Sequence, residues 1–449
     1  MGPISKQKQS WCKMIEKITK YLQQFKDQLS DWKINISKTE GREIYLIGNT
    51  VDMARVKNIE NVRLTVYKDF KHQAKTCRGS ASTIIHPTMN DSEMEETIQK
   101  AIYAAGFVKN EHFPIVNHVV CINYPGGSST PLQELTEIMP RWIQEILEPS
   151  QEMNGVSINS AELFLNLKEE TILNSKGLSV NFIQPSISIE CITQAQGLQE
   201  EIELNDDIRL ADLKEGILKS KIMQLLRYTH DRSKAVLLPK VDEVPVILSG
   251  DCVGDLLQYY LHRLSARFIH ENISDTDIGE NIQGDQVEGD LITLYLDPQL
   301  PGSYYSRPFD TDGFPLHRFR LIHQGAVERY WGDIQYSHYI HTAPTGQWCN
   351  ISVESGSSTL QQMKAEPFLE ITHFSDFQTD YITGDFGGEI RLGYYFDGSR
   401  LQPVYGGSIA GNLKKIHHQM TLSKEKRLLK KYYGPCSIKL KGVNVAGNI

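Results

Sequence analysis

Two acidic residues, Asp251 and Asp255, have a type and spacing that could support chemistry. They lie just before and near the start of a stretch, residues 252–268, in which apolar residues recur at the three-and-four spacing of a helix. Side chains four residues apart share one face of a helix, so the two carboxylates could hold a divalent ion such as magnesium or calcium. A hydrolase with a carboxylate metal site is therefore one hypothesis.

The residues just before this helix also have an ordinary structural explanation. An apolar run at residues 246–248 predicts a strand, which ends in the polar turn Ser249, Gly250 and Asp251. Active-site groups are often displayed at such turns, because the strand is rigid and the turn is exposed. Ser249 or Asp251 could equally serve as the cap of the helix, and spacing alone favours this second interpretation.

Histidines form a second group of candidate metal ligands, at His317, His323, His338 and His341, with Cys349 close behind in the sequence. Imidazole and thiolate both suit zinc. However, the one regular pair, His338 and His341, has no acidic neighbour, and in a strand these two side chains would point to opposite faces. We therefore predict no metal site here. No cofactor is predicted either, because the phosphate-binding motifs GxGxxG and GxxxxGK[ST] are both missing.

The hydropathy pattern predicts an α+β fold. It indicates helices at residues 11–32, 92–105, 131–147 and 210–229, with Pro140 as a possible kink in the third. Strands are expected at residues 32–37 and 43–47, separated by a turn at TEGR. The stretch Asn174-Ser175-Lys176-Gly177 predicts a hairpin turn, because Asn and Gly tolerate positive φ.

At 449 residues the chain is long enough for two domains, and we place their boundary near residue 235. Residues 1–235 are expected to form an N-terminal α+β domain of sheet and helices. Residues 236–449, rich in Gly, Tyr and polar turns, are expected to form a C-terminal β-rich domain.

Composition narrows the functional classes. The formal net charge of −8 argues against broad nucleic-acid binding, and the basic run at residues 424–431 (KEKRLLKK) is interpreted as a solvated helix face. The seven cysteines are odd in number and scattered, which is not typical of a disulfide framework or a zinc finger. No window approaches a membrane span, and no signal core is present at the N-terminus. A cytoplasmic protein that binds neither nucleic acid nor membrane is expected.

Several motifs, in order along the chain, resemble those of the TldD/PmbA family of metalloprotease-complex proteins. They are NSKG at 174–177, VPVILSGDCVGDLL at 244–257, FDTDGFPLHR at 309–318, GDF at 384–386 and YGGSIAGNL at 405–413. The second motif resembles the segment in which the family's TldD subunit carries the zinc-binding helix HExxxH. In that alignment Gly250 and Asp255 replace the two histidines, and Asp251 replaces the glutamate.

This departure from the family's motif makes the chain similar to the PmbA (TldE) type. The resemblance implies a non-catalytic subunit of a TldD/TldE-type metalloprotease complex that degrades peptides, with zinc only in a TldD-type HExxxH partner. Older labels call PmbA a modulator of DNA gyrase; with a net charge of −8 we do not predict DNA binding from that name. No catalytic residue is predicted, since Gly250, Asp251 and Asp255 are only the degenerate motif positions.

Two alternatives stay open at this point. The first is a stand-alone, homodimeric peptide-binding or scaffold protein, which would bind peptides without turnover. The second is the hydrolase with a carboxylate metal site, which would lose its activity on Asp251→Ala.

Overall fold

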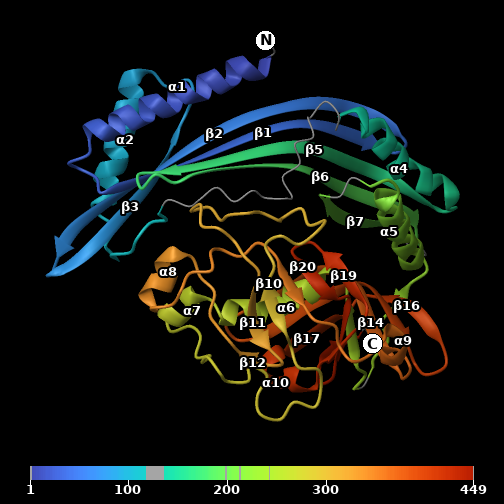
Figure 1. Cartoon of the computed structure of the whole chain (residues 1–449). Helices are drawn as coiled ribbons and strands as arrows, with labels where there is room; N and C mark the ends of the chain where they lie inside the picture. Colours follow the sequence, from blue (N-terminus) through green and yellow to red (C-terminus); the bar gives the residue numbers. More distant parts are fainter. Residues whose placement is uncertain (1–2, 118–135, 198–199, 212–213, 242, 448–449) are drawn as a thin grey trace.

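The computed structural model describes residues 3–117, 136–197, 200–211, 214–241 and 243–447. A sheet of long strands from the N-terminal half arches over a second part built from shorter strands and short helices (Figure 1). The prediction of an α+β fold with two sheet-based parts is confirmed.

The N-terminal sheet has seven strands in the order β4-β3-β2-β1-β5-β6-β7, all antiparallel to their neighbours. Its strands are β1 (Asp31–Ile47), β2 (Thr50–His72), β3 (Lys75–Ile85), β4 (Asn110–Glu111), β5 (Val156–Asn174), β6 (Ser179–Gln196) and β7 (Glu201–Leu210).

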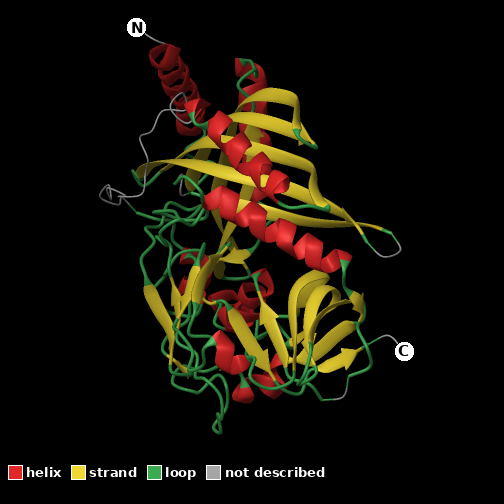
Figure 2. Ribbon diagram, turned by 90° about the vertical axis from the view of Figure 1, so that its right-hand side faces the viewer, coloured by secondary structure: helices red, strands yellow, loops and turns green. Residues whose placement is uncertain are grey.

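Two pairs of helices cover this sheet: α1 (Pro3–Gln24) with α2 (Asp91–Ala105), and α4 (Met139–Glu152) with α5 (Ile217–Ser233). The first pair packs on β1, β2 and β3 at one end, and the second pair packs on β5, β6 and β7 at the other. The second pair faces the viewer in Figure 2. None of the described helices combines the length and apolarity needed to cross a membrane.

The predicted turn at TEGR is wrong, because β1 runs without interruption through these residues. Gly41 lies in the strand and pairs with Asn166 of β5. A Cβ atom on Gly41 would lie 2.5 Å from the side-chain oxygen of Asn166. The glycine is therefore explained by close packing between strands rather than by a turn.

The helix predictions were partly wrong at their ends. The first helix ends at Gln24, because Trp32 is already paired with Val66 in the sheet. Pro140 lies in the first turn of α4, where proline is tolerated, and a turn at residue 138 separates α4 from the helical residues 136–137, so the helix is interrupted near the predicted kink. The predicted residues 131–135 lie outside the described residues. The helix expected from residue 210 begins at Ile217, because residues up to Leu210 belong to β7.

The C-terminal part contains two sheets. One has six strands: β10 (Leu294–Leu296), β11 (Phe319–His323), β12 (Ala326–Val327), β13 (Ile351–Val353), β19 (Lys426–Leu429) and β20 (Tyr432–Pro435). The other has nine: β8 (Val236–Leu237), β9 (Val246–Ser249), β14 (Phe368–Thr379), β15 (Asp385–Phe396), β16 (Leu401–Tyr405), β17 (Ser408–Asn412), β18 (Thr421–Leu422), β21 (Ser437–Leu440) and β22 (Asn444–Ala446).

One large apolar core joins these two sheets around the buried helix α6 (Asp251–Arg263). The shorter helices are α7 (Ala266–His270), α8 (Ile334–Tyr339), α9 (Leu360–Met363) and α10 (Leu413–Ile416). Helix α5 ends at Ser233 and β8 begins at Val236. The domain boundary near residue 235 remains a prediction that lies in this short connection.

Candidate functional site

The turn between β9 and α6 positions the residues singled out from the sequence. Strand β9 is central in its sheet, between β21 and β14. Gly250 then adopts φ 90° and ψ −152°, a conformation open almost only to glycine, and Asp251 begins the helix. This glycine allows the chain to reverse from the strand into α6.

Neither residue proposed as a helix cap has that role, so this interpretation is wrong. The N-cap position is Gly250, and no side chain caps the helix. The Ser249 hydroxyl donates instead to Glu370 at 2.8 Å and contacts the Ser437 hydroxyl at 2.7 Å. Asp251 is turned toward another partner.

That partner is Lys430, whose Nζ lies 2.9 Å from Oδ2 of Asp251. Lys430 stands in the turn between β19 and β20, with φ 47°. Burial alone would lower the pKa of Lys430, but the neighbouring carboxylates, Asp251 first and then Asp207 and Asp206, together raise this pKa above its ordinary value. The ammonium group is therefore a fixed cation at the start of α6.

Asp255 lies one turn further along α6 and accepts a hydrogen bond from Gln258 at 3.2 Å. Burial in the pocket and the neighbouring carboxylate of Asp251 raise the pKa of Asp255, and Lys430 acts in the opposite direction. The two carboxylates thus lie close enough to influence each other, but only Asp251 has an ion-pair partner among the described residues.

Both carboxylates line a cavity of about 240 Å³ between α6, the β19–β20 hairpin and two aromatic side chains. The aromatic rings are Tyr305 and Trp348, and the ammonium group of Lys431 lies 5.0 Å and 5.1 Å from their centroids. The interpretation of residues 424–431 as a solvated helix face is wrong. Residues 426–429 form strand β19 of a β-hairpin, and Lys430 and Lys431 in the turn that follows line the cavity.

The N-terminal domain contributes to the electrostatics of this cavity through Asp206 of β7. Burial raises the pKa of Asp206, and the charge of Asp251 raises it further, while Lys430 opposes both effects. The cavity therefore lies near the junction of the two parts of the chain. Sequence analysis missed Lys430, Lys431 and Asp206 because they are distant from α6 in the sequence.

A single substitution tests the electrostatic effect of Lys430 on Asp255 in this cavity. Lys430→Met should raise the pKa of Asp255 further, because it removes the positive charge that favours the ionised carboxylate. A carboxyl pKa that is raised in the folded state contributes stability at low pH, and this contribution is lost as the pH rises through the folded pKa. The variant should therefore lose more stability than the parent between about pH 4 and pH 6.

NMR titration of the Asp255 carboxyl carbon gives the pKa directly. Lys441→Met is a matched control, since it removes an exposed lysine away from the cavity. An unchanged Asp255 pKa in Lys430→Met would contradict the coupling.

The histidine group is not assembled into a site. His338 lies on the short helix α8 rather than on a strand, and His341 follows it with φ 57°. His317 and His323 are exposed, whereas Cys349 is buried with its thiol toward the Pro298 carbonyl. Within the described ranges, no three His, Cys, Asp or Glu side chains are grouped so that they could hold a metal ion.

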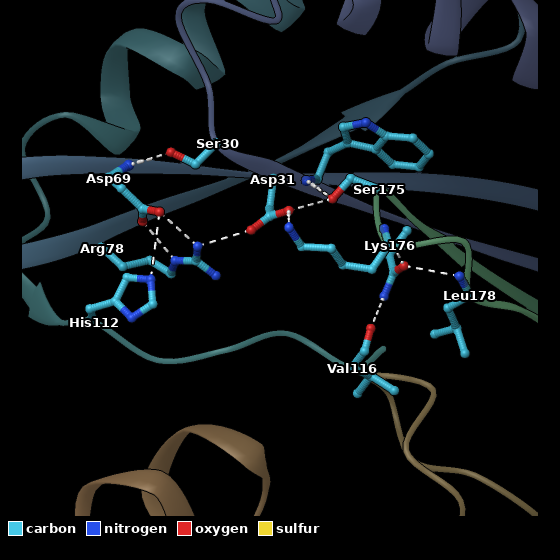
Figure 3. A network of polar contacts seen from close by, with 11 residues as sticks. Ser30, Asp31, Asp69, Arg78, His112, Val116, Ser175, Lys176 and Leu178 are labelled. Carbon is cyan, nitrogen blue, oxygen red and sulfur yellow. Dashed lines mark hydrogen bonds and ion pairs between the residues drawn. The ribbon is translucent and has the colours of Figure 1, made fainter. Parts of the chain in front are cut away.

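The predicted hairpin turn after β5 is present, with Gly177 at φ 83°. Oδ1 of Asn174 accepts from the backbone N–H of Lys176 and Leu178, and its Nδ2 donates to the Val116 carbonyl at 2.7 Å (Figure 3). The NSKG motif therefore both closes the turn and fastens the segment before residue 118 to the sheet.

The same turn is linked to a buried ion network that sequence analysis missed (Figure 3). Ser175 donates to Asp31 at 2.7 Å, and Asp31 also accepts from Arg78 at 2.9 Å. Arg78 in turn donates two hydrogen bonds to Asp69. The side chains of Arg78 and Asp31 are only 5% and 3% exposed, so their charges depend on each other.

Comparisons with known proteins agree with this fold. TldE from Thermococcus kodakarensis superposes with a TM-score of 0.77 at 17% identity, over 96% of this chain and 100% of that one. The Thermotoga maritima protein TM0727, whose name links it to modulation of DNA gyrase, gives 0.77 at 15% identity, over 97% and 100%. At these identities the likeness shows the fold, which is the two-part α+β fold of TldE.

The sequence comparison goes further for the C-terminal part. Residues 241–447 match the family described as PmbA/TldA metallopeptidase C-terminal domain. The uncharacterized protein MJ0231 of Methanocaldococcus jannaschii is 25% identical over 185 residues, which span 37% of this chain and 42% of that protein. The C-terminal part of the chain, residues 241–447, thus matches the family that the sequence motifs indicated.

Proposed function

We propose that this chain is a PmbA (TldE)-type, non-catalytic subunit of a TldD/TldE-type metalloprotease complex that degrades peptides. The observation that carries the proposal is the ion pair of Asp251 with Lys430 at the motif position, where the TldD subunit is expected to hold zinc. A further supporting observation is that the motif positions supply Gly250 and Asp255 rather than two histidines.

The residues at this position do not fit zinc. Gly250 has no ligand atom, and carboxylate oxygen is a poorer zinc ligand than imidazole or thiolate. The ammonium of Lys430 already neutralises Asp251 at 2.9 Å and would repel a second cation. Cys252 offers no alternative, since burial raises the pKa of its thiol well above the ordinary value.

In this role the chain contributes binding surface, and a TldD-type HExxxH partner contributes the zinc. The cavity beside α6 and the long antiparallel strands offer apolar, aromatic and charged contacts to an extended peptide. Strand addition is the recognition mode that we expect, because an extended peptide can hydrogen-bond along a sheet edge. The complex is proposed to act in the cytoplasm, with no role for nucleic acid.

The first experiment measures metal in the purified, untagged chain by plasma mass spectrometry, together with hydrolysis of a mixed peptide library. The proposal predicts near-zero zinc and no turnover by the chain alone. It further predicts turnover when a HExxxH-bearing TldD-type subunit is added. A hydrolysis rate equal to that of the added subunit alone would contradict the heteromeric role.

Stoichiometric metal and turnover in the isolated chain would also overturn the proposal. In that case Asp251→Ala distinguishes the carboxylate-site hydrolase, which loses activity, from a site elsewhere. Peptide binding by the chain alone, without turnover and without any effect of the added subunit, would favour the stand-alone homodimeric scaffold.

A further inference from the structure

The free edge of β2 is an unusual feature of the N-terminal sheet. Strand β2 pairs with β1 from Thr50 to Tyr67, but β3 pairs with it only from Val62 onward. Among the described residues no strand pairs with the outer edge of residues 50–61. Alternate residues of this segment therefore direct backbone N–H and C=O groups away from the sheet, where another strand can bind them.

Both faces of this segment are also exposed. Val51, Val56 and Ile59 are 51%, 72% and 44% exposed, although valine and isoleucine usually lie against other side chains in a sheet. The register shift opposite Tyr45 and Leu46 places Val51 on the same face as Val56, and Ile59 lies on the opposite face. A strand added to this edge would cover apolar groups on both faces.

The charges along the edge define the strand that would fit. Arg55 and Lys57 lie at its centre, with Asp52 and Glu60 on either side. Arg55 lies 5.1 Å from the ring centroid of Tyr45, and Lys57 is 3.6 Å from a carboxylate oxygen of Glu43.

A second copy of this chain fits the edge poorly. When two identical antiparallel strands pair about a two-fold axis, one residue lies opposite itself. The two-fold axis can pass through residue 55 or residue 56 if nearly all of the edge is to be paired. In the first case Arg55 faces Arg55 of the other copy, and in the second it faces Lys57. Like charges directly opposite each other destabilise such a pair.

We propose that residues 50–61 are a docking edge for an extended strand of a different polypeptide chain. That strand is acidic where it faces Arg55 and Lys57 and basic where it faces Asp52 and Glu60. The inference rests on the proposed function for the existence of a second chain, since a heteromeric complex supplies one. The edge itself can be tested without that complex.

The probe is a synthetic peptide as long as the edge, with Glu opposite the two central cations and Lys opposite the two flanking acids. A second peptide has the Glu and Lys residues exchanged. The full chain should bind the first peptide at least about tenfold more tightly than the second. Binding should also slow amide hydrogen exchange in residues 50–61.

Variants of the chain show whether the charges decide this preference. Arg55→Glu/Lys57→Glu should abolish the preference for the first peptide. Lys71→Glu/Lys75→Glu is the matched control, because it makes the same charge change at exposed positions at the other end of β2 and in β3. The control should keep the preference of the parent chain.

Three results would overturn the docking edge: equal binding of the two peptides, absence of binding, or no slowing of exchange in residues 50–61. Self-association of the chain with protection of this segment would also overturn it, because the occupant would then be a second copy. Failure of the proposed function is recognised separately. If the first peptide binds as expected but a HExxxH subunit brings no added turnover, the docking edge stands and the protease role falls.

Discussion

Replacing Arg78 with methionine is expected to lower the free energy of unfolding by about 3–5 kcal/mol, because it leaves two carboxylates without their buried cation. Asp31 would keep Ser175 and Lys176 as partners, whereas the Asp69 carboxylate would lose both hydrogen bonds from Arg78 and keep His112 at 3.6 Å. Methionine preserves most of the side-chain volume, so the loss reports on charge rather than on packing.

Urea denaturation followed by circular dichroism measures this change. Lys100→Met is the control, since its exposed ion pair with Glu96 should contribute almost nothing. A loss smaller than about 1 kcal/mol in Arg78→Met would contradict the assignment of a buried, mutually dependent network.

The same variant should change the response to acid. Burial raises the pKa of Asp69, but the hydrogen bonds and charge of Arg78 outweigh burial and hold this pKa below its ordinary value. The resulting stability is present above the unfolded pKa and is lost as the pH falls through the folded pKa. Arg78→Met should therefore lose less of its remaining stability than the parent on acidification below about pH 4.

Restoring the two histidines of the family's zinc motif is expected to fail. In Gly250→His/Asp255→His, the first histidine must adopt φ 90° and ψ −152°, which costs about 1–3 kcal/mol for a residue with a Cβ atom. The backbone then either keeps this strain or rearranges the turn that begins α6. Lys430 would also remain beside Asp251 and oppose a divalent cation.

Zinc content after dialysis against a zinc buffer, together with thermal unfolding, measures both effects. Asp255→His alone is the control, because this position in α6 has ordinary helical backbone geometry. Stoichiometric zinc in the double variant, at undiminished stability, would show that neither the backbone nor the lysine prevents metal binding.

Features with local causes were predictable from the sequence. Helix α2 begins after Asn90, whose side chain accepts a hydrogen bond from the Glu93 backbone N–H. The Glu93 side chain in turn accepts a hydrogen bond from the Asn90 backbone N–H. The start of this helix could therefore be predicted from adjacent residues. The NSKG turn is predictable for the same reason.

Features with distant causes were not predictable. Gly41 suggests a turn from its neighbours, but its reason is the contact with Asn166 on another strand. Asp251 could be found from its position after an apolar run. Its role could not, because Lys430 comes from a hairpin near the other end of the chain. The run KEKRLLKK at residues 424–431 fits a strand as well as a helix, because so few residues show no clear period.

The pairing of Lys430 with Asp251 has a consequence for the metal requirement of a chain in the proposed subunit role. The lysine side chain is a covalent part of the protein. A chelator therefore cannot remove this cation, and a competing metal cannot replace it. Asp251 is then neutralised without a bound metal, so a chain in the proposed subunit role would not depend on zinc for folding around α6. In a complex with a zinc-bearing partner, metal supply would therefore limit only the partner.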